Sequence, residues 1–203
     1  MNRINHFYYT KKLLLKGALT SSVIFLIFQV PVFAGWQDGA GYLELADRLD
    51  RPQDGYCLDI AGTGDWIEFN VPLNAHNCKL PGLFADGAVT FNSPGPIHFP
   101  AYEGCVTAVG LNGLSLPGAA LMVKACAKDI DTNRAPFISE TLQNFNHLDD
   151  GRIELDDSGL CLTVSAVSDR TFSPDHRWRA LFLADCTTVD STLSVWKPFR
   201  PQS

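Results

Sequence analysis

Apolar and polar residues alternate in three stretches of the chain, and each stretch follows a glycine. The stretches begin at Gly41, Gly95 and Gly151, which lie 54 and 56 residues apart. A period of two predicts a strand with one buried face, and a pattern that recurs at a near-constant spacing indicates a repeated structural unit. The sequence therefore predicts three segments of one design, over 41–94, 95–150 and 151–199.

Each segment contains a pair of cysteines at similar places. The first members of the pairs are Cys57, Cys105 and Cys161, and the second members, Cys78, Cys126 and Cys186, follow after 21, 21 and 25 residues. Alternation resumes around each first cysteine, which predicts a second strand there. A leucine stands five residues before each second cysteine, at Leu73, Leu121 and Leu181, and marks a third strand.

The cysteine count and the shared register predict three disulfides. Six cysteines alone permit fifteen pairings. Because each second cysteine keeps its place relative to the first, we expect the pairs to form within segments: Cys57 with Cys78, Cys105 with Cys126, and Cys161 with Cys186.

The predicted fold class is all-β. A fourth strand in each segment should carry an aromatic residue into a shared core, with Phe84, Phe145 and Trp196 as candidates. Many short strands, Gly and Pro turns and no helical period favour a closed barrel with a hairpin cap, since closure removes exposed strand edges. A two-sheet sandwich is compatible with the same composition.

The N-terminus has the pattern of a signal peptide. Basic residues near the start precede an apolar run over 23–33, and small residues end at Ala34. This order predicts cleavage after residue 34. The run is shorter than the roughly 20 apolar residues that cross a bilayer. We therefore expect a mature domain over 35–203 without a membrane span.

Charge and cysteine use limit the partners of the mature chain. Without residues 1–34 it has 12 basic and 22 acidic residues, a net charge of −10. Nucleic acid and anionic membrane surfaces are therefore poor partners, because both need clustered Lys and Arg. Six cysteines after an export signal are typical of an oxidising compartment, which predicts a secreted or periplasmic protein.

These residues together resemble the ricin B-chain lectin domain. Gly55-Tyr56-Cys57-Leu58-Asp59, the cysteine pair within each segment and the three tandem copies carry the resemblance over 41–199. The family's Gln-x-Trp motif is degenerate here, as Gln143-Asn144-Phe145, Ser194-Val195-Trp196 and Gly82-Leu83-Phe84. The resemblance implies a β-trefoil of three repeats that binds a glycan in a shallow pocket.

The resemblance also implies a binding site in the first segment. Asp59, two residues after Cys57, matches the acid that accepts hydrogen bonds from sugar hydroxyls, and Thr107 and Thr163 replace it elsewhere. His76 stands where an aromatic residue stacks on the sugar, and Asn74 is a second polar partner. Trp66, in a polar stretch between the second and third strands, is a further candidate platform or a core residue.

No motif in the chain indicates an enzyme, a metal site or a cofactor. A nucleophile elbow, a paired-histidine zinc motif and a phosphate-binding glycine loop are all missing from the sequence. The acid pairs Asp149-Asp150 and Asp156-Asp157 are typical of solvated turns.

The sequence leaves two functions open. The first is a lectin-like module that binds a glycan or glycoconjugate through Asp59, Asn74, His76 and Trp66. By analogy with the family, it could be the binding subunit of a larger toxin or surface assembly. The second is a β-trefoil that binds a protein partner, as an inhibitor or assembly protein, through the long polar loops 127–141 and 165–177.

Overall fold

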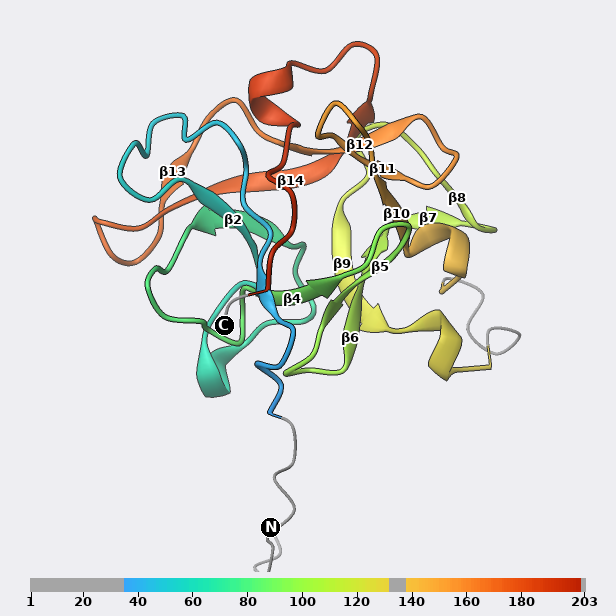
Figure 1. The fold of residues 1–203 in the computed structure, drawn as a ribbon, viewed down its shortest axis with the longest axis horizontal. Coiled ribbons are helices and arrows are strands. Elements are labelled where there is room, and N and C mark those ends of the chain that lie inside the picture. The colour runs from blue at the N-terminus through green and yellow to red at the C-terminus, as the bar shows by residue number, and fades with distance from the viewer. Residues whose placement is uncertain (1–34, 132–137, 202–203) are drawn as a thin grey trace, which may run out of the picture. The chain divides into compact units, whose positions relative to one another are not determined.

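The regular structure consists of β-strands and short 3₁₀ helices, in a computed structural model that describes residues 35–131 and 138–201 (Figure 1). The expected all-β class is confirmed for these residues. The predicted signal peptide, residues 1–34, lies outside them.

Strands and turns alternate through all three segments. The first contains β1 (Gly41–Tyr42), β2 (Tyr56–Asp59), η1 (Gly64–Trp66), β3 (Asn74–Asn77) and β4 (Ala88–Phe91). The second contains β5 (Gly95–Phe99), β6 (Gly104–Ala108), β7 (Gly110–Leu111), β8 (Leu114–Ser115), β9 (Leu121–Ala125), η2 (Ala127–Asp129), η4 (Glu140–Leu142) and β10 (Asn144–His147). The third contains β11 (Ile153–Leu155), β12 (Leu160–Val164), β13 (Asp169–Arg170), β14 (Arg177–Asp185) and η5 (Ser191–Leu193).

The strands pair antiparallel in one branched sheet, to which the small β7–β8 sheet is added. Strand β2 pairs with β3, β6 with β9, and β12 with β14. Each pairing is spanned by one disulfide: Cys57–Cys78, Cys105–Cys126 and Cys161–Cys186. These are the pairs expected from the sequence register.

The core is filled by the inward residues of these strands. Trp196, Tyr56, Phe99 and Phe145 are among the largest fully buried side chains. The indole of Trp196 donates a hydrogen bond to the Leu162 carbonyl at 3.0 Å, which satisfies its one polar atom inside the core.

The expected core position of Phe84 is wrong. Its side chain is 49% exposed and precedes β4, whereas Val89 on β4 is fully buried. Val89 lies opposite Gly41 just as Phe145 lies opposite Gly95. The fourth strand of the first segment therefore carries Val89 inward, five positions after the predicted Phe84.

Candidate functional site

Asp59 lies at the end of β2 and takes part in a buried cluster of charges. Its carboxylate is paired with Lys79, whose Nζ lies 2.8 Å from Asp59 Oδ2 and 2.6 Å from Asp86 Oδ2. Asp59 and Asp86 are 4% and 3% exposed. We call these three residues the Asp59 cluster.

Burial has the largest effect on the protonation of Asp59. It raises the pKa of Asp59 to about 7, an effect that Lys79 opposes and the second carboxylate, Asp86, reinforces. Burial alone would lower the pKa of Lys79, but the two carboxylates raise it overall. Lys79 therefore stays charged while Asp59 changes charge near neutral pH.

One acceptor in this cluster is unused within the described residues. Asp86 Oδ1 is buried and has no hydrogen-bond partner there. A buried oxygen without a partner is costly, and a carboxylate can only accept. Asp86 Oδ1 is thus one acceptor of the cluster that a donor such as a hydroxyl would satisfy.

Gln143 fills the corresponding position of the second segment. It stands two residues before Phe145, as Gly87 stands two before Val89. Its amide donates to Thr107 Oγ1 at 2.8 Å and to the Ala125 carbonyl at 2.9 Å, and its oxygen accepts from the Ala127 amide at 2.7 Å. Neutral hydrogen bonds thus complete this position without a charge.

Gly87 leaves no room for such a side chain in the first segment. A Cβ at this position would lie 2.8 Å from Cε1 of Tyr42 and 3.4 Å from Asp59 Oδ2. Tyr42 is held there because its hydroxyl donates to the Gly82 carbonyl and accepts from the Phe84 amide. The first segment therefore replaces the glutamine with an aromatic ring and the Asp59 cluster.

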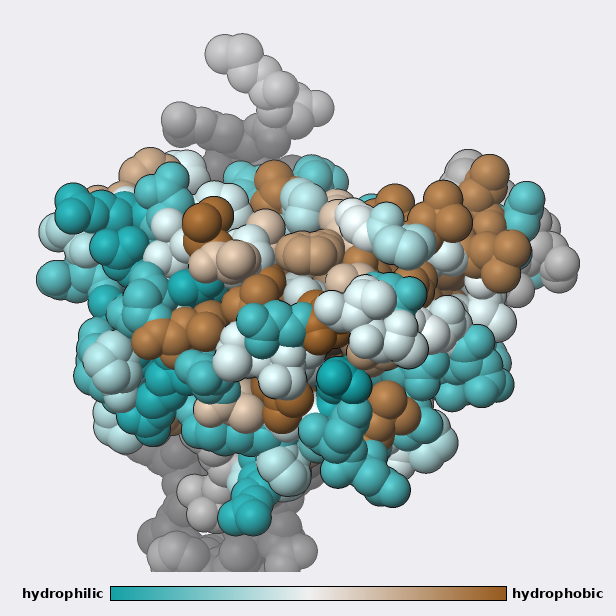
Figure 2. All heavy atoms as spheres, turned by 90° about the horizontal axis from the view of Figure 1, so that it is seen from above, coloured by the Kyte–Doolittle hydropathy of each residue, from teal (hydrophilic) through white to brown (hydrophobic). Residues whose placement is uncertain are grey.

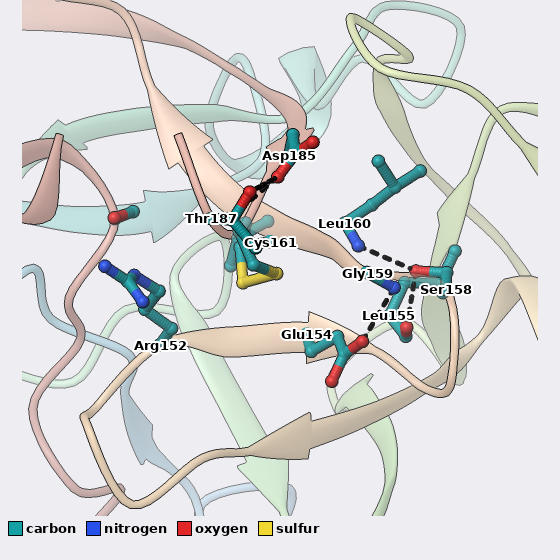
Figure 3. Close-up of a disulfide and its surroundings, with 12 residues drawn as sticks. Arg152, Glu154, Leu155, Ser158, Gly159, Leu160, Cys161, Asp185 and Thr187 are labelled. Atoms are coloured by element: carbon teal, nitrogen blue, oxygen red, sulfur yellow. Dashed lines mark hydrogen bonds between the residues drawn. A yellow bond between two sulfur atoms is a disulfide. The ribbon is translucent and has the colours of Figure 1, made fainter. Parts of the chain in front are cut away.

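The third segment has hydroxyl side chains at the positions of Asp59 and Lys79. Thr163, the equivalent of Asp59, donates to the Cys161 carbonyl at 2.9 Å. Thr187, which follows Cys186 as Lys79 follows Cys78, donates to Asp185 (Figure 3). Of the three equivalent positions after the second cysteine, Lys79, Ala127 and Thr187, the first alone carries a charge.

Two tyrosines lie near the Asp59 cluster. Tyr42 and Tyr102 both have a raised pKa, chiefly through burial, and both lie within electrostatic reach of the three charges. The Tyr102 ring packs edge-on against Phe69, with 5.2 Å between ring centroids. A buried polar centre beside aromatic surface is the combination that binds a polyol with one apolar face.

Asn74 and His76 lie on β3, beside β2. Asn74 is directly opposite Asp59, and His76 is opposite Cys57. Burial lowers the pKa of His76 to about 4, so its ring is neutral at physiological pH. Its Nδ1 hydrogen-bonds with the Asn77 carbonyl at 2.9 Å, and its ring meets that of His176 edge-on at 5.2 Å.

Trp66 is placed differently from these three residues. It ends η1, in the segment between β2 and β3, and its side chain is 80% exposed. The structure therefore brings Asp59 and Asn74 together, puts His76 on the same strand as Asn74, and leaves Trp66 on an exposed turn.

Two hollows lie beside the disulfides of the first two segments. One of about 380 Å³ is lined by Tyr42, Glu44, Cys57, Leu80, Lys197, Pro198, Arg200 and Pro201. The other, about 150 Å³, is lined by Thr90, Asn92, Pro96, His98, Cys105 and Lys128. Asp59 lines neither hollow, and its side chain is 6% exposed.

Lys79 and Asp86 complete the Asp59 cluster but were not predicted from the sequence. The signal for Lys79 was its place directly after Cys78. Asp86 could have been found by aligning the segments so that Gly95 matches Gly151. This alignment matches Gly87 to Gln143, and Asp86 stands directly before Gly87.

Within the described residues, no group of three His, Cys, Asp or Glu side chains is arranged to hold a metal ion. In the same part of the chain, no helix is long and apolar enough to cross a membrane.

The fold is similar to solved structures that have low sequence identity. An agglutinin from Abrus precatorius is 19% identical with a TM-score of 0.52, over 78% of this chain and 48% of the agglutinin chain. This chain thus spans about half the length of that protein. The mdaA-1 domain is 15% identical with a TM-score of 0.50, over 77% of this chain and 88% of the domain.

These structural matches show a shared all-β fold and leave the ligand undecided. The sequence matches no protein-family model. It also matches no curated protein.

Proposed function

We propose that the chain is a lectin-like module that binds a glycan at the Asp59 cluster. The observation that carries the proposal is the buried pair of carboxylates on Lys79, with Asp86 Oδ1 left without a partner among the described residues and the Tyr42 ring and Asp59 both next to Gly87. Charge-assisted acceptors orient sugar hydroxyls, and aromatic carbon covers the apolar face of the sugar. The ricin-like fold shared with an agglutinin supports the same function.

The proposed architecture is a β-trefoil. Three antiparallel hairpins of similar register, each closed by a disulfide, support three repeats over 41–94, 95–150 and 151–199. Three disulfides also support an oxidising environment. We therefore propose secretion, or residence in the periplasm, after cleavage of residues 1–34, which mass spectrometry of the exported protein tests directly.

The decisive experiment is a glycan-array screen of the exported, fully oxidised protein beside its Asp59→Asn variant. A shallow single pocket binds with a dissociation constant on the order of millimolar, so the protein is displayed in many copies to gain avidity. Loss of a charge-assisted hydrogen bond costs about 1.5–3 kcal/mol. We expect Asp59→Asn to weaken binding at least about tenfold.

Thr163→Ala is the matched control, because Thr163 occupies the position of Asp59 in the third segment. It should bind glycans like the original protein. A blank array from folded, oxidised protein would refute the proposal. Equal losses from Asp59→Asn and Thr163→Ala would show that binding does not depend on the Asp59 cluster.

Exposed apolar side chains favour a second candidate, a contact with a protein partner. Val167 and Phe172, in the loop 165–177, are almost fully exposed. Figure 2 shows apolar residues distributed among polar ones over one face of the molecule. If the partner binds this loop, Phe172→Ser removes that contact and leaves glycan binding unchanged, whereas Asp59→Asn has the opposite effect.

A further inference from the structure

The sheet formed by β2, β3, β14 and β13 brings residues from two segments onto one face. Across these strands Cys57 lies opposite His76, His76 opposite Trp178, and Trp178 opposite Asp169. Residues directly opposite one another in antiparallel strands share a face of the sheet. Trp178, from the third segment, therefore stands beside His76 of the first.

The Asp59 cluster reaches the same face. Asp59 lies opposite Asn74, and Asn74 lies opposite Ala180. Asp59 and Cys57 are two residues apart, so their side chains point to the same side. The alternate residues Leu58, Ala75 and Arg179 are buried on the other side. Asp59, Asn74, His76 and Trp178 thus share the outer face.

Exposure increases along this face from β2 to β14. Asp59 is 4% exposed, Asn74 and His76 are partly buried, and Trp178 is 40% exposed. The ring of His176 already contacts His76. Of these side chains, Trp178 offers the largest free aromatic surface, and Asp169, exposed on its far side, adds a carboxylate.

The distance across this face exceeds one sugar ring. Neighbouring strands lie about 4.8 Å apart, and consecutive residues lie about 3.4 Å apart along a strand. Trp178 is two strands and two residues away from Asp59. The Cα atoms of these two residues are therefore about 12 Å apart. This backbone separation is longer than one sugar ring, so it suits a ligand of at least two sugar residues.

We propose that Trp178 and Asp169 form a second sugar subsite, so that the ligand is an oligosaccharide with one residue at the Asp59 cluster and the next stacked on Trp178. This inference rests on the proposed glycan binding. Trp178 supplies the flat apolar surface and Asp169 a hydrogen-bond acceptor, while the neutral Asn74 and His76 line the path between the two subsites.

The test compares monosaccharides with their disaccharides. Galactose and lactose, N-acetylglucosamine and its β-1,4-linked dimer, and mannose and mannobiose are titrated against the exported protein by ligand-observed NMR. We expect one class to bind more tightly as the disaccharide. In Trp178→Ala this preference should fall about three- to tenfold, because aromatic packing contributes on that scale, while monosaccharide affinity stays within about twofold.

Trp178→Phe should restore most of the preference, and Leu114→Ala, which removes an exposed apolar side chain from β8, should leave it intact. An unchanged preference in Trp178→Ala would overturn the subsite but not glycan binding. If Trp178→Ala weakened the monosaccharide and the disaccharide equally, Trp178 would belong to a single-sugar pocket. That result would also overturn the second subsite. If the original protein binds no sugar, both proposals fail.

Discussion

At the scale of single residues, one buried carboxylate links charge, stability and the proposed ligand. Asp59 has a pKa near 7 because burial disfavours its charged form more strongly than Lys79 favours it. An unfolded chain would release this proton near pH 3.9. Between pH 3.9 and pH 7 the folded state holds the proton of Asp59 more tightly than the unfolded chain does. The contribution of Asp59 to stability is therefore complete below about pH 4 and is lost as pH rises through 7.

The difference in melting temperature between the original protein and Asp59→Asn should therefore depend on pH. We expect the original protein to lose several degrees relative to the variant between pH 5 and pH 8, since asparagine cannot titrate. Thermal unfolding of the two proteins at matched pH measures this. A difference that is constant across the range would contradict the raised pKa.

At the scale of elements, Asp50 joins the turn between β1 and β2 to the third segment. Its carboxylate accepts hydrogen bonds from Arg179 at 2.5 Å, Tyr56 at 2.8 Å and Ser168 at 2.6 Å. Partial burial acts to raise the pKa of Asp50, but hydrogen bonds from Ser168, Arg179 and Tyr56 hold it well below its usual range. The Arg179 guanidinium also lies 4.8 Å from the centre of the Tyr56 ring.

Asp50→Asn should destabilise the protein through this contact. Arg179 is 4% exposed and would be left as a buried cation without its carboxylate, whereas Asp50 itself is 40% exposed and partly screened by water. We expect a loss of about 1–3 kcal/mol, below the full cost of breaking a buried pair. Denaturant unfolding measures it, and amide exchange should increase in the loop 165–177.

Asp150→Asn is the control for this prediction, because the Asp150–Arg152 pair has a half-exposed carboxylate. It should cost less than about 1 kcal/mol. If the two variants cost the same, the Asp50 contact adds nothing beyond an ordinary surface pair.

At the scale of the whole molecule, the three disulfides close loops of nearly equal length. Their sequence separations are 21, 21 and 25 residues. In the chain-entropy account the stabilisation depends on the logarithm of loop length. Removing each pair by double substitution to alanine should therefore cost about 3 kcal/mol, and the three variants should agree within about 1 kcal/mol.

Urea unfolding of the three double variants under non-reducing conditions tests this equivalence. A much larger cost for Cys57 and Cys78 would show that their disulfide also holds the Asp59 cluster in place. A negligible cost for any pair would show that its hairpin is held by packing alone.

The sequence by itself determined the strand pattern, the class of fold and the cysteine pairs. The period-two alternation and the spacing of 54 and 56 residues are signals in the sequence itself. They do not depend on how the strands are arranged in space. The positions of Asp59 and Asn74 on neighbouring strands followed from the same register.

Tertiary structure alone decided which residues complete the site. Lys79 and Asp86 join Asp59 because the chain between β3 and β4 returns to the end of β2, where the Ile60 amide donates to the Asp86 carbonyl. Trp178 lies beside His76 because β14 of the third segment pairs with β3 of the first. Local patterns do not encode such contacts, since the strands that make them are far apart in sequence. The buried state of Asp59, and hence its pKa, arises from the same long-range packing.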